Sequence, residues 1–261
     1  MRIRKFGAFV LAFSTAAAIT SIAGASEPAV PGKVESKMVE FKGGAGMVKG
    51  YLAKPEGKGP FPAIVVIHEW WGLTDWIKEN ADRFAAQGYV ALAVDLYGGK
   101  ATKDPAVAHE LMRALDDKEG IHDLEGGVAY LKSLDCVAKN KKIGTVGWCM
   151  GGKFSRLIGE ESKDIGPTAI CYGGVSTEST AIEKLAGKPV LGIFGGKDRG
   201  IPAAKVEEYA GLLKKKGSKV DLHIYKDAGH GFMRPGPSQS ADDAKDAWKQ
   251  IDAFFAETLK S

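Results

Sequence analysis

The stretch Gly147-Trp148-Cys149-Met150-Gly151, which follows the apolar run 143–146, decides the fold of this chain. The pattern is G-x-nucleophile-x-G, with cysteine in a position that serine often takes. Glycines prevent backbone clashes in such a sharp turn, and the N-terminus of the helix that follows favours a negative charge on sulfur. We therefore expect Cys149 to be a nucleophile with a lowered thiol pKa and the Met150 N–H to face an oxyanion. The alternative is a buried structural cysteine.

The same residues overlap the pattern of a phosphate-binding loop. The stretch from Gly147 to Gly152 followed by Lys153 matches G-x-x-x-x-G-K. The next residue is Phe154, where such loops carry the Ser or Thr that binds magnesium. We therefore do not expect nucleotide binding.

Apolar runs rich in β-branched residues recur on both sides of the cysteine turn. Runs of this kind are typical of strands buried on both faces of a parallel sheet. They are 63–67, 89–94, 143–146, 168–172 and 190–194, and the alternating run 220–225 adds one more strand. Amphipathic helical patterns separate or follow them at 76–86, 123–134, 204–216 and 244–259.

These patterns predict a single α/β domain. Its sheet is expected to be largely parallel and twisted, with helices on both faces and right-handed crossovers. Two short runs at 39–41 and 47–53 flank glycines and predict an antiparallel hairpin at the N-terminal end of the domain. We place the domain at 38–261, after a loose segment at 26–37 that Pro and Gly punctuate.

Residues 1–25 have the features of a secretory signal peptide. A basic start is followed by an apolar stretch and by the small-x-small pattern Ala23-Gly24-Ala25. We expect cleavage after Ala25 and an exported protein, periplasmic or secreted, with no stable membrane association. An uncleaved anchor is the alternative, but polar residues interrupt an apolar core shorter than the roughly 20 residues a span needs.

Composition excludes several classes of protein. The chain is 44% hydrophobic and 26% charged, which is ordinary for a globular protein and excludes coiled coils and disordered tails. Its formal charge of +4 is too small and too evenly spread to indicate a nucleic-acid partner. Three cysteines leave at least one free thiol, and pairing of Cys136 with Cys171 stays an open possibility.

A catalytic thiol needs a base, and the base needs a group that orients it. His230 lies in a loop after the strand 220–225, and Asp198 lies just after the strand 190–194. Ligand sites in open α/β sheets lie outside the carboxyl ends of the strands, so these residues and Cys149 are expected at one edge. The chain order nucleophile, acid, histidine distinguishes this arrangement from other triad hydrolases.

The stretch His68-Glu69-Trp70-Trp71-Gly72 follows the strand 63–67 and should supply the second oxyanion donor, which we assign to the Trp70 N–H. A buried carboxylate at Glu69 is costly without a partner and is not explained by packing. The two tryptophans can either fill the core or form a pocket wall. The stretch begins like the zinc motif H-E-x-x-H, but Gly72 replaces the second histidine, so we expect no metal and no cofactor.

Taken together, these motifs resemble the dienelactone hydrolase family within the α/β-hydrolase superfamily, over about residues 38–259. The resemblance implies an α/β-hydrolase fold and a triad of Cys149, Asp198 and His230. It also implies that Glu69 pairs with the resting thiol and helps to activate it. The matching stretches are 68–72, 95–97, 147–152, 196–198 and 229–232.

The resemblance also suggests which residues bind substrate. Arg234 matches a position where the family's arginine holds a substrate carboxylate. The well-studied lactonases of the family carry a second arginine after the segment that ends at Tyr97, whereas this chain has Gly98-Gly99-Lys100. We therefore expect Arg234, Trp71, Tyr97 and Lys100 to line the substrate site.

The expected chemistry follows from the thiol. A thiolate leaves more easily than an alkoxide, so the tetrahedral intermediate goes forward only when the other group also leaves easily. The expected substrates are small activated esters or lactones, cleaved through a thioester by a monomeric enzyme. A non-catalytic binding protein on this scaffold is one alternative. A thiol redox protein is another, but the chain has no C-x-x-C motif.

Overall fold

The computed structural model describes residues 32–261. The signal peptide expected at 1–25 lies outside the described residues, as does the first half of the segment expected to be loose. The last part of that segment is ordered, because strand β1 (Val34–Lys42) begins four residues before the expected domain boundary. Strand β1 pairs along its whole length with β2 (Met47–Pro55), from Val34 opposite Pro55 to Lys42 opposite Met47. The expected hairpin is therefore present and longer than its apolar runs.

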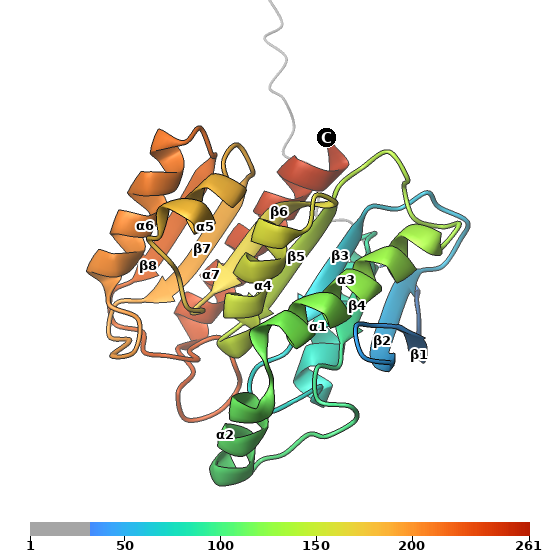
Figure 1. Ribbon diagram of the computed structural model, residues 1–261, viewed down its shortest axis with the longest axis horizontal. Coiled ribbons are helices and arrows are strands. Elements are labelled where there is room, and N and C mark those ends of the chain that lie inside the picture. Colours follow the sequence, from blue (N-terminus) through green and yellow to red (C-terminus); the bar gives the residue numbers. More distant parts are fainter. Residues whose placement is uncertain (1–31) are drawn as a thin grey trace, which may run out of the picture. The chain divides into compact units, whose positions relative to one another are not determined.

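The sheet has eight strands in the order β1-β2-β4-β3-β5-β6-β7-β8 (Figure 1). The strands β1, β2 and β4 pair antiparallel, and every other neighbouring pair is parallel. This confirms the expected largely parallel sheet with an antiparallel hairpin. The remaining strands are β3 (Ala63–Ile67), β4 (Val90–Val94), β5 (Ile143–Trp148), β6 (Ile165–Cys171), β7 (Val190–Gly195) and β8 (Val220–Tyr225).

Helices cover both faces of the sheet. One face packs against α1 and α7, and the other packs against α3, α4, α5 and α6. The bounds are α1 (Asp75–Ala86), α2 (Pro105–Ala114), α3 (Asp117–Ser133), α4 (Met150–Glu161), α5 (Ser179–Lys184), α6 (Ala203–Lys215) and α7 (Ala241–Phe255), which a π-helical turn (Ala256–Lys260) extends.

Helices α3 and α2 differ from the expectation from sequence, and the short helix α5 was not expected. Helix α3 begins six residues earlier than its apolar pattern, because the Asp116 side chain accepts hydrogen bonds from the N–H groups of Lys118 and Glu119. Helix α2 has Asp104 as its N-cap and Pro105 in its first turn, and Ala108 is its one buried residue. Figure 1 shows α2 at one end of the sheet, away from the helices that cover the faces.

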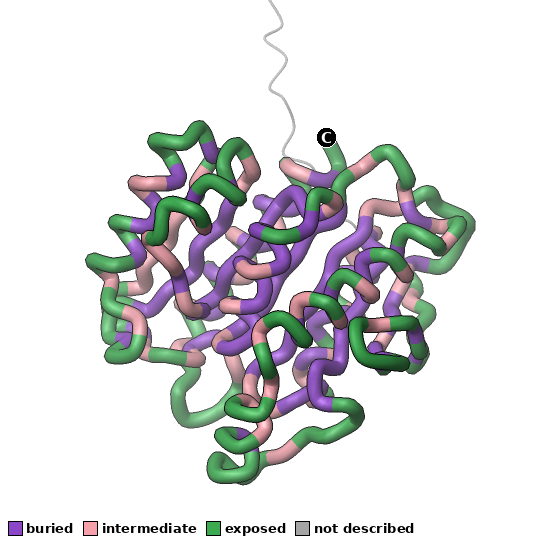
Figure 2. Tube along the Cα trace, viewed as in Figure 1, coloured by how far each residue is buried: buried purple, intermediate pink, exposed green. Residues whose placement is uncertain are grey.

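Buried residues lie mainly along the central strands of the sheet (Figure 2). Their side chains alternate between the two faces of the sheet. In β3, Ile64 and Val66 contact the α1 and α7 side, whereas Val65 and Ile67 contact the α3 and α4 side. All five residues of β3 are buried. Strand β3 has β4 on one side and β5 on the other, so the strand order reverses at β3. A reversal of this kind opens a crevice at the carboxyl ends of the strands, where ligands bind.

Candidate active site

The backbone at Cys149 adopts a conformation that few non-glycine residues take. Its φ of 56° and ψ of −117° turn the chain sharply from β5 into α4. The turn is possible because its neighbours carry no side chain. A Cβ on Gly147 would lie 2.1 Å from the carbonyl oxygen of Gly151, and one on Gly151 would lie 2.3 Å from that of Ile67. The G-x-C-x-G spacing is thus a packing requirement of this turn.

Three side chains from three strand ends form one hydrogen-bonded chain. His230 Nε2 lies 3.1 Å from Cys149 Sγ, and His230 Nδ1 lies 2.7 Å from Asp198 Oδ2. The Asp198 carboxylate is buried, and its other oxygen accepts hydrogen bonds from the N–H groups of Gly200 (2.9 Å) and Ile201 (3.2 Å). The imidazole is therefore oriented by a fixed carboxylate and reaches the sulfur, as the sequence order predicts.

Two backbone N–H groups are directed at the same sulfur. They belong to Met150, the first residue of α4, and to Trp70, which follows β3, and both lower the pKa of the Cys149 thiol. These are the two groups that the sequence indicates as oxyanion donors. Donors that surround the nucleophile in this way also surround the carbonyl oxygen of a group bonded to it.

The expected lowering of the thiol pKa is reversed. Burial and the nearby carboxylate of Glu69 outweigh the N–H groups and raise the pKa of Cys149 to about 12. The sequence-based expectation considered only the helix N-terminus, whereas desolvation depends on the tertiary packing around the sulfur. The resting thiol is therefore protonated, and the imidazole of His230 is an adjacent acceptor for its proton.

Glu69 lies beside Arg234, and the Arg234 guanidinium in turn lies over the ring of Trp71. Burial raises the pKa of Glu69 to about 7, and the Arg234 guanidinium opposes that rise. Arg234 Nε lies 3.8 Å from Glu69 Oε2, and its guanidinium carbon lies 4.9 Å from the centre of the Trp71 ring. Trp71 packs edge-on against Trp70 and is half-buried. Trp71 thus holds Arg234, whereas Trp70 packs against the core.

Comparison with known proteins identifies the family. The sequence profile of the dienelactone hydrolase family matches residues 48–259. The chain belongs to the dienelactone hydrolase family. Members of this family hydrolyse carboxylic ester bonds, and this chain is a hydrolase of that kind.

Relatives of the dienelactone hydrolase family cover nearly the whole chain. A Methylorubrum extorquens protein provisionally named carboxymethylenebutenolidase is 31% identical over 261 residues, covering 95% of this chain and 88% of that protein. Protein usf of Aquifex pyrophilus is 32% identical over 233 residues, covering 85% of this chain and 99% of that protein. The solved structure of a dienelactone hydrolase-like promiscuous phosphotriesterase from metagenomic libraries has a TM-score of 0.78 at 22% identity. The match covers 87% of this chain and 100% of that one. This last likeness shows a common fold.

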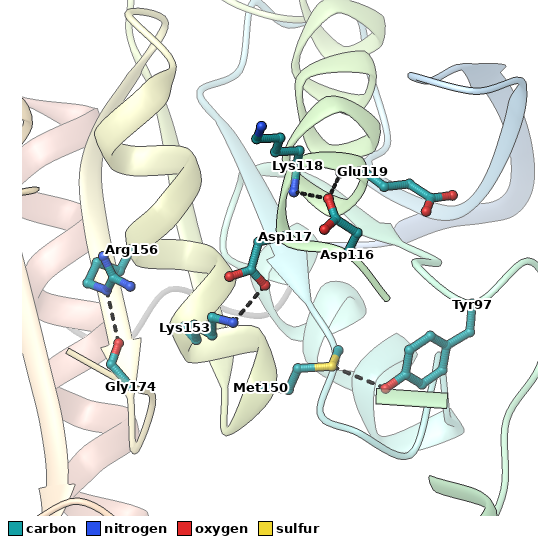
Figure 3. A network of polar contacts seen from close by, with 9 residues as sticks. All are labelled: Tyr97, Asp116, Asp117, Lys118, Glu119, Met150, Lys153, Arg156 and Gly174. Atoms are coloured by element: carbon teal, nitrogen blue, oxygen red, sulfur yellow. Dashed lines mark hydrogen bonds and ion pairs between the residues drawn. The ribbon is translucent and has the colours of Figure 1, made fainter. Parts of the chain in front are cut away.

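The residues expected to bind a substrate carboxylate in this dienelactone hydrolase family member lie in separate cavities. Arg234 and Trp71 line a cavity of about 720 Å³ beside α1. Lys100 and Tyr97 line another, next to the β1–β2 turn. The Tyr97 hydroxyl donates to Met150 Sδ at 3.1 Å (Figure 3), so Tyr97 supports the residue after the nucleophile. Arg234 and Lys100 thus line different cavities.

One residue of the site was missed by sequence reasoning. Tyr172 follows β6 with a φ of 36°, and its ring packs edge-on against the His230 imidazole with 5.3 Å between ring centres. Its hydroxyl is buried and has no hydrogen-bond partner among residues 32–261. The sequence offered a weak signal, because Tyr172 stands directly before Gly173-Gly174 at a strand end.

Several other features bear on the chemistry. All three cysteines are free, so the possible Cys136–Cys171 pair is not formed. Within residues 32–261, no group of three or more His, Cys, Asp or Glu side chains is placed to hold a metal ion. In the same part of the chain, the structure contains no helix with the length and apolar character to cross a bilayer.

Proposed function

We propose that this protein is an exported hydrolase that uses Cys149 as its nucleophile. Its substrates are activated carboxylic esters or lactones of the carboxymethylenebutenolide type, cleaved through a thioester. The observation that carries the proposal is the 3.1 Å distance from His230 Nε2 to Cys149 Sγ, with Asp198 2.7 Å from the other ring nitrogen. The curated relatives named as carboxymethylenebutenolidases support the substrate class.

In the first step the substrate carbonyl lies against Cys149. The S–H proton passes to His230 Nε2 as the S–C bond forms, because the raised thiol pKa leaves little free thiolate in the resting enzyme. The carbonyl oxygen becomes an oxyanion that accepts hydrogen bonds from the N–H groups of Met150 and Trp70. The C–O bond to the leaving group then breaks, and the leaving oxygen takes the proton from His230.

In the second step water hydrolyses the thioester. His230 takes a proton from the water as its oxygen attacks the carbonyl carbon, and Asp198 stabilises the imidazolium that forms. The C–S bond breaks, the sulfur recovers its proton from His230, and the acid leaves. Loss of one oxyanion donor typically lowers the rate by about 10²–10³. Amides are poor substrates, because the amine leaves less readily than the thiolate.

Substitution of the sulfur tests this proposal. Cys149→Ala is expected to abolish hydrolysis of p-nitrophenyl acetate with the fold intact, and Cys149→Ser to be much slower than wild type. Cys136→Ala is the matched control, because Cys136 is also a free, half-buried cysteine but lies outside this site. Turnover by pure Cys149→Ala protein, or equal rates for Cys149→Ser and wild type, would contradict the proposal.

Export is a separate part of the proposal. Its support is the basic start, the apolar stretch and Ala23-Gly24-Ala25 at the N-terminus. Expression of the full chain in a Gram-negative host is expected to yield a periplasmic or secreted monomer that begins at Ser26. A full-length product that keeps residues 1–25 and stays with the membrane would contradict it.

A further inference from the structure

His68 is a buried histidine next to the active site to which the steps above give no role. It follows strand β3 directly, and none of its surface is exposed. Its Nδ1 lies 2.6 Å from the carbonyl oxygen of Glu69, and its Nε2 lies 3.1 Å from the backbone nitrogen of Leu96. Both ring nitrogens therefore have backbone partners, one on the stretch after β3 and the other on the stretch after β4.

These two partners determine where the ring of His68 carries its proton. The Glu69 carbonyl can only accept a hydrogen bond, so Nδ1 carries the proton and donates. The Leu96 N–H can only donate, so Nε2 accepts and carries no proton. Burial lowers the pKa of His68, which keeps the ring in this neutral form. A ring protonated on both nitrogens would direct an N–H against the N–H of Leu96.

The carbonyl of Glu69 belongs to the same peptide group as the N–H of Trp70. A trans peptide group is planar, and its C=O and N–H point in opposite directions. A hydrogen bond that fixes the carbonyl therefore also fixes the direction of the Trp70 N–H, which faces Cys149. The N–H of Gly72 also donates to this carbonyl, at 3.2 Å, and the bond from His68 is the shorter of the two.

We propose that His68 is a positioning residue that holds the Glu69–Trp70 peptide group with its N–H toward the oxyanion. The ring acts through this peptide group and does not touch the substrate. A hydrogen bond accepted by the carbonyl also polarises the peptide group, which makes its N–H a stronger donor. The inference rests on the proposed function, because it assigns the residue that orients one of the two oxyanion donors of that mechanism.

Two amide substitutions separate the two hydrogen bonds of the ring. In His68→Asn the amide nitrogen is bonded to Cγ, as Nδ1 is, so it can still donate to the Glu69 carbonyl while Leu96 loses its acceptor. In His68→Gln the amide lies one bond further out, so its oxygen can accept from Leu96 while the Glu69 carbonyl loses this donor. Both variants lose the ring, which packs against Tyr97 with 4.9 Å between ring centres, so a packing role would affect both alike.

Hydrolysis of p-nitrophenyl acetate by the folded fraction of each variant is the first readout. His68→Gln should lower kcat by about 10–10², less than the loss of a whole donor, because the Gly72 N–H still holds the carbonyl. KM should stay within about threefold, because the oxyanion forms in both steps and both slow together. His68→Asn should keep kcat within about threefold of wild type. His122→Gln is the matched control, because His122 is exposed on α3.

Alkylation of Cys149 by iodoacetamide is a second readout that requires no turnover. The Trp70 N–H lowers the pKa of the Cys149 thiol, so an N–H that turns away leaves less thiolate. At pH 8, Cys149 of His68→Gln should react about threefold more slowly than in wild type, because the greater nucleophilicity of the remaining thiolate offsets part of the loss. His68→Asn should react at the wild-type rate.

A measurement on wild type keeps the inference testable if neither variant folds. The imidazole nitrogen shifts of His68 in an NMR spectrum at pH 7 should show the proton on Nδ1. A proton on Nε2, or equal kcat for the two amide variants, would overturn the inference and leave the proposed function intact. Absence of ester hydrolysis by wild type would overturn the proposed function. Alkylation would then decide whether His68 directs the Trp70 N–H, and equal rates for the two variants would show that it does not.

Discussion

Replacement of Glu69 by glutamine should change the pH dependence of stability. The carboxyl is buried, and burial raises its pKa to about 7 from an ordinary value of 4.5. The folded state therefore keeps this proton to higher pH than the unfolded state does. The stability that protonated Glu69 contributes is complete below pH 4.5 and is lost as the pH rises through 7. A glutamine side chain has nearly the same shape and does not titrate.

The magnitude follows from the two pKa values. A pKa of about 7 in the fold against 4.5 in the unfolded chain corresponds to about 3 kcal/mol when both states are ionised. Most of this loss of stability, about 2 kcal/mol, develops between pH 5 and pH 8. Wild type should therefore lose about 2 kcal/mol relative to Glu69→Gln over that interval.

Urea unfolding of both proteins at pH 5 and pH 8 measures this difference. Glu208→Gln is the control, because Glu208 is exposed on α6. A second readout is alkylation by iodoacetamide at pH 8. The Glu69 carboxylate raises the pKa of Cys149, so the variant should react faster at this thiol. Parallel stability curves for wild type and Glu69→Gln, together with unchanged alkylation, would refute the reasoning.

Two further substitutions test other parts of the site. Asp198→Asn should lower kcat for p-nitrophenyl acetate by about 10²–10⁴, because the amide no longer fixes the imidazole tautomer. A decrease in kcat of less than about threefold would contradict this role of Asp198. Tyr172→Phe removes a buried hydroxyl that has no partner in the described part of the chain, so the free energy of unfolding in urea should rise by about 1 kcal/mol. A fall of that size would show that the hydroxyl has a partner.

Local pattern was enough to predict most of the sheet. The apolar run 63–67 has the bounds of strand β3, since a strand buried on both faces needs apolar residues at every position. Helix α2 was missed although its apolar residues follow the helical period; it lies at the end of the sheet and buries one alanine. Its capping residues Asp104 and Pro105 mark the start of the helix in the sequence, but they were not used.

The site was partly predictable for a similar reason. Cys149, Asp198 and His230 each follow a strand, and parallel strands bring such residues to one edge of the sheet. The pKa of the thiol was not predictable, because it depends on how closely the core and Glu69 surround the sulfur. The separation of Arg234 from Lys100 depends on loop paths that sequence spacing does not fix.

The most direct test of the account is the chemical identity of the intermediate. Wild-type enzyme turning over p-nitrophenyl acetate is quenched rapidly in acid, digested and examined by mass spectrometry. The account predicts one acetyl group on the peptide that contains Cys149, removable by neutral hydroxylamine and missing from His230→Gln under the same conditions. Steady turnover with Cys149 unmodified, or with the acetyl group on another side chain, would contradict it.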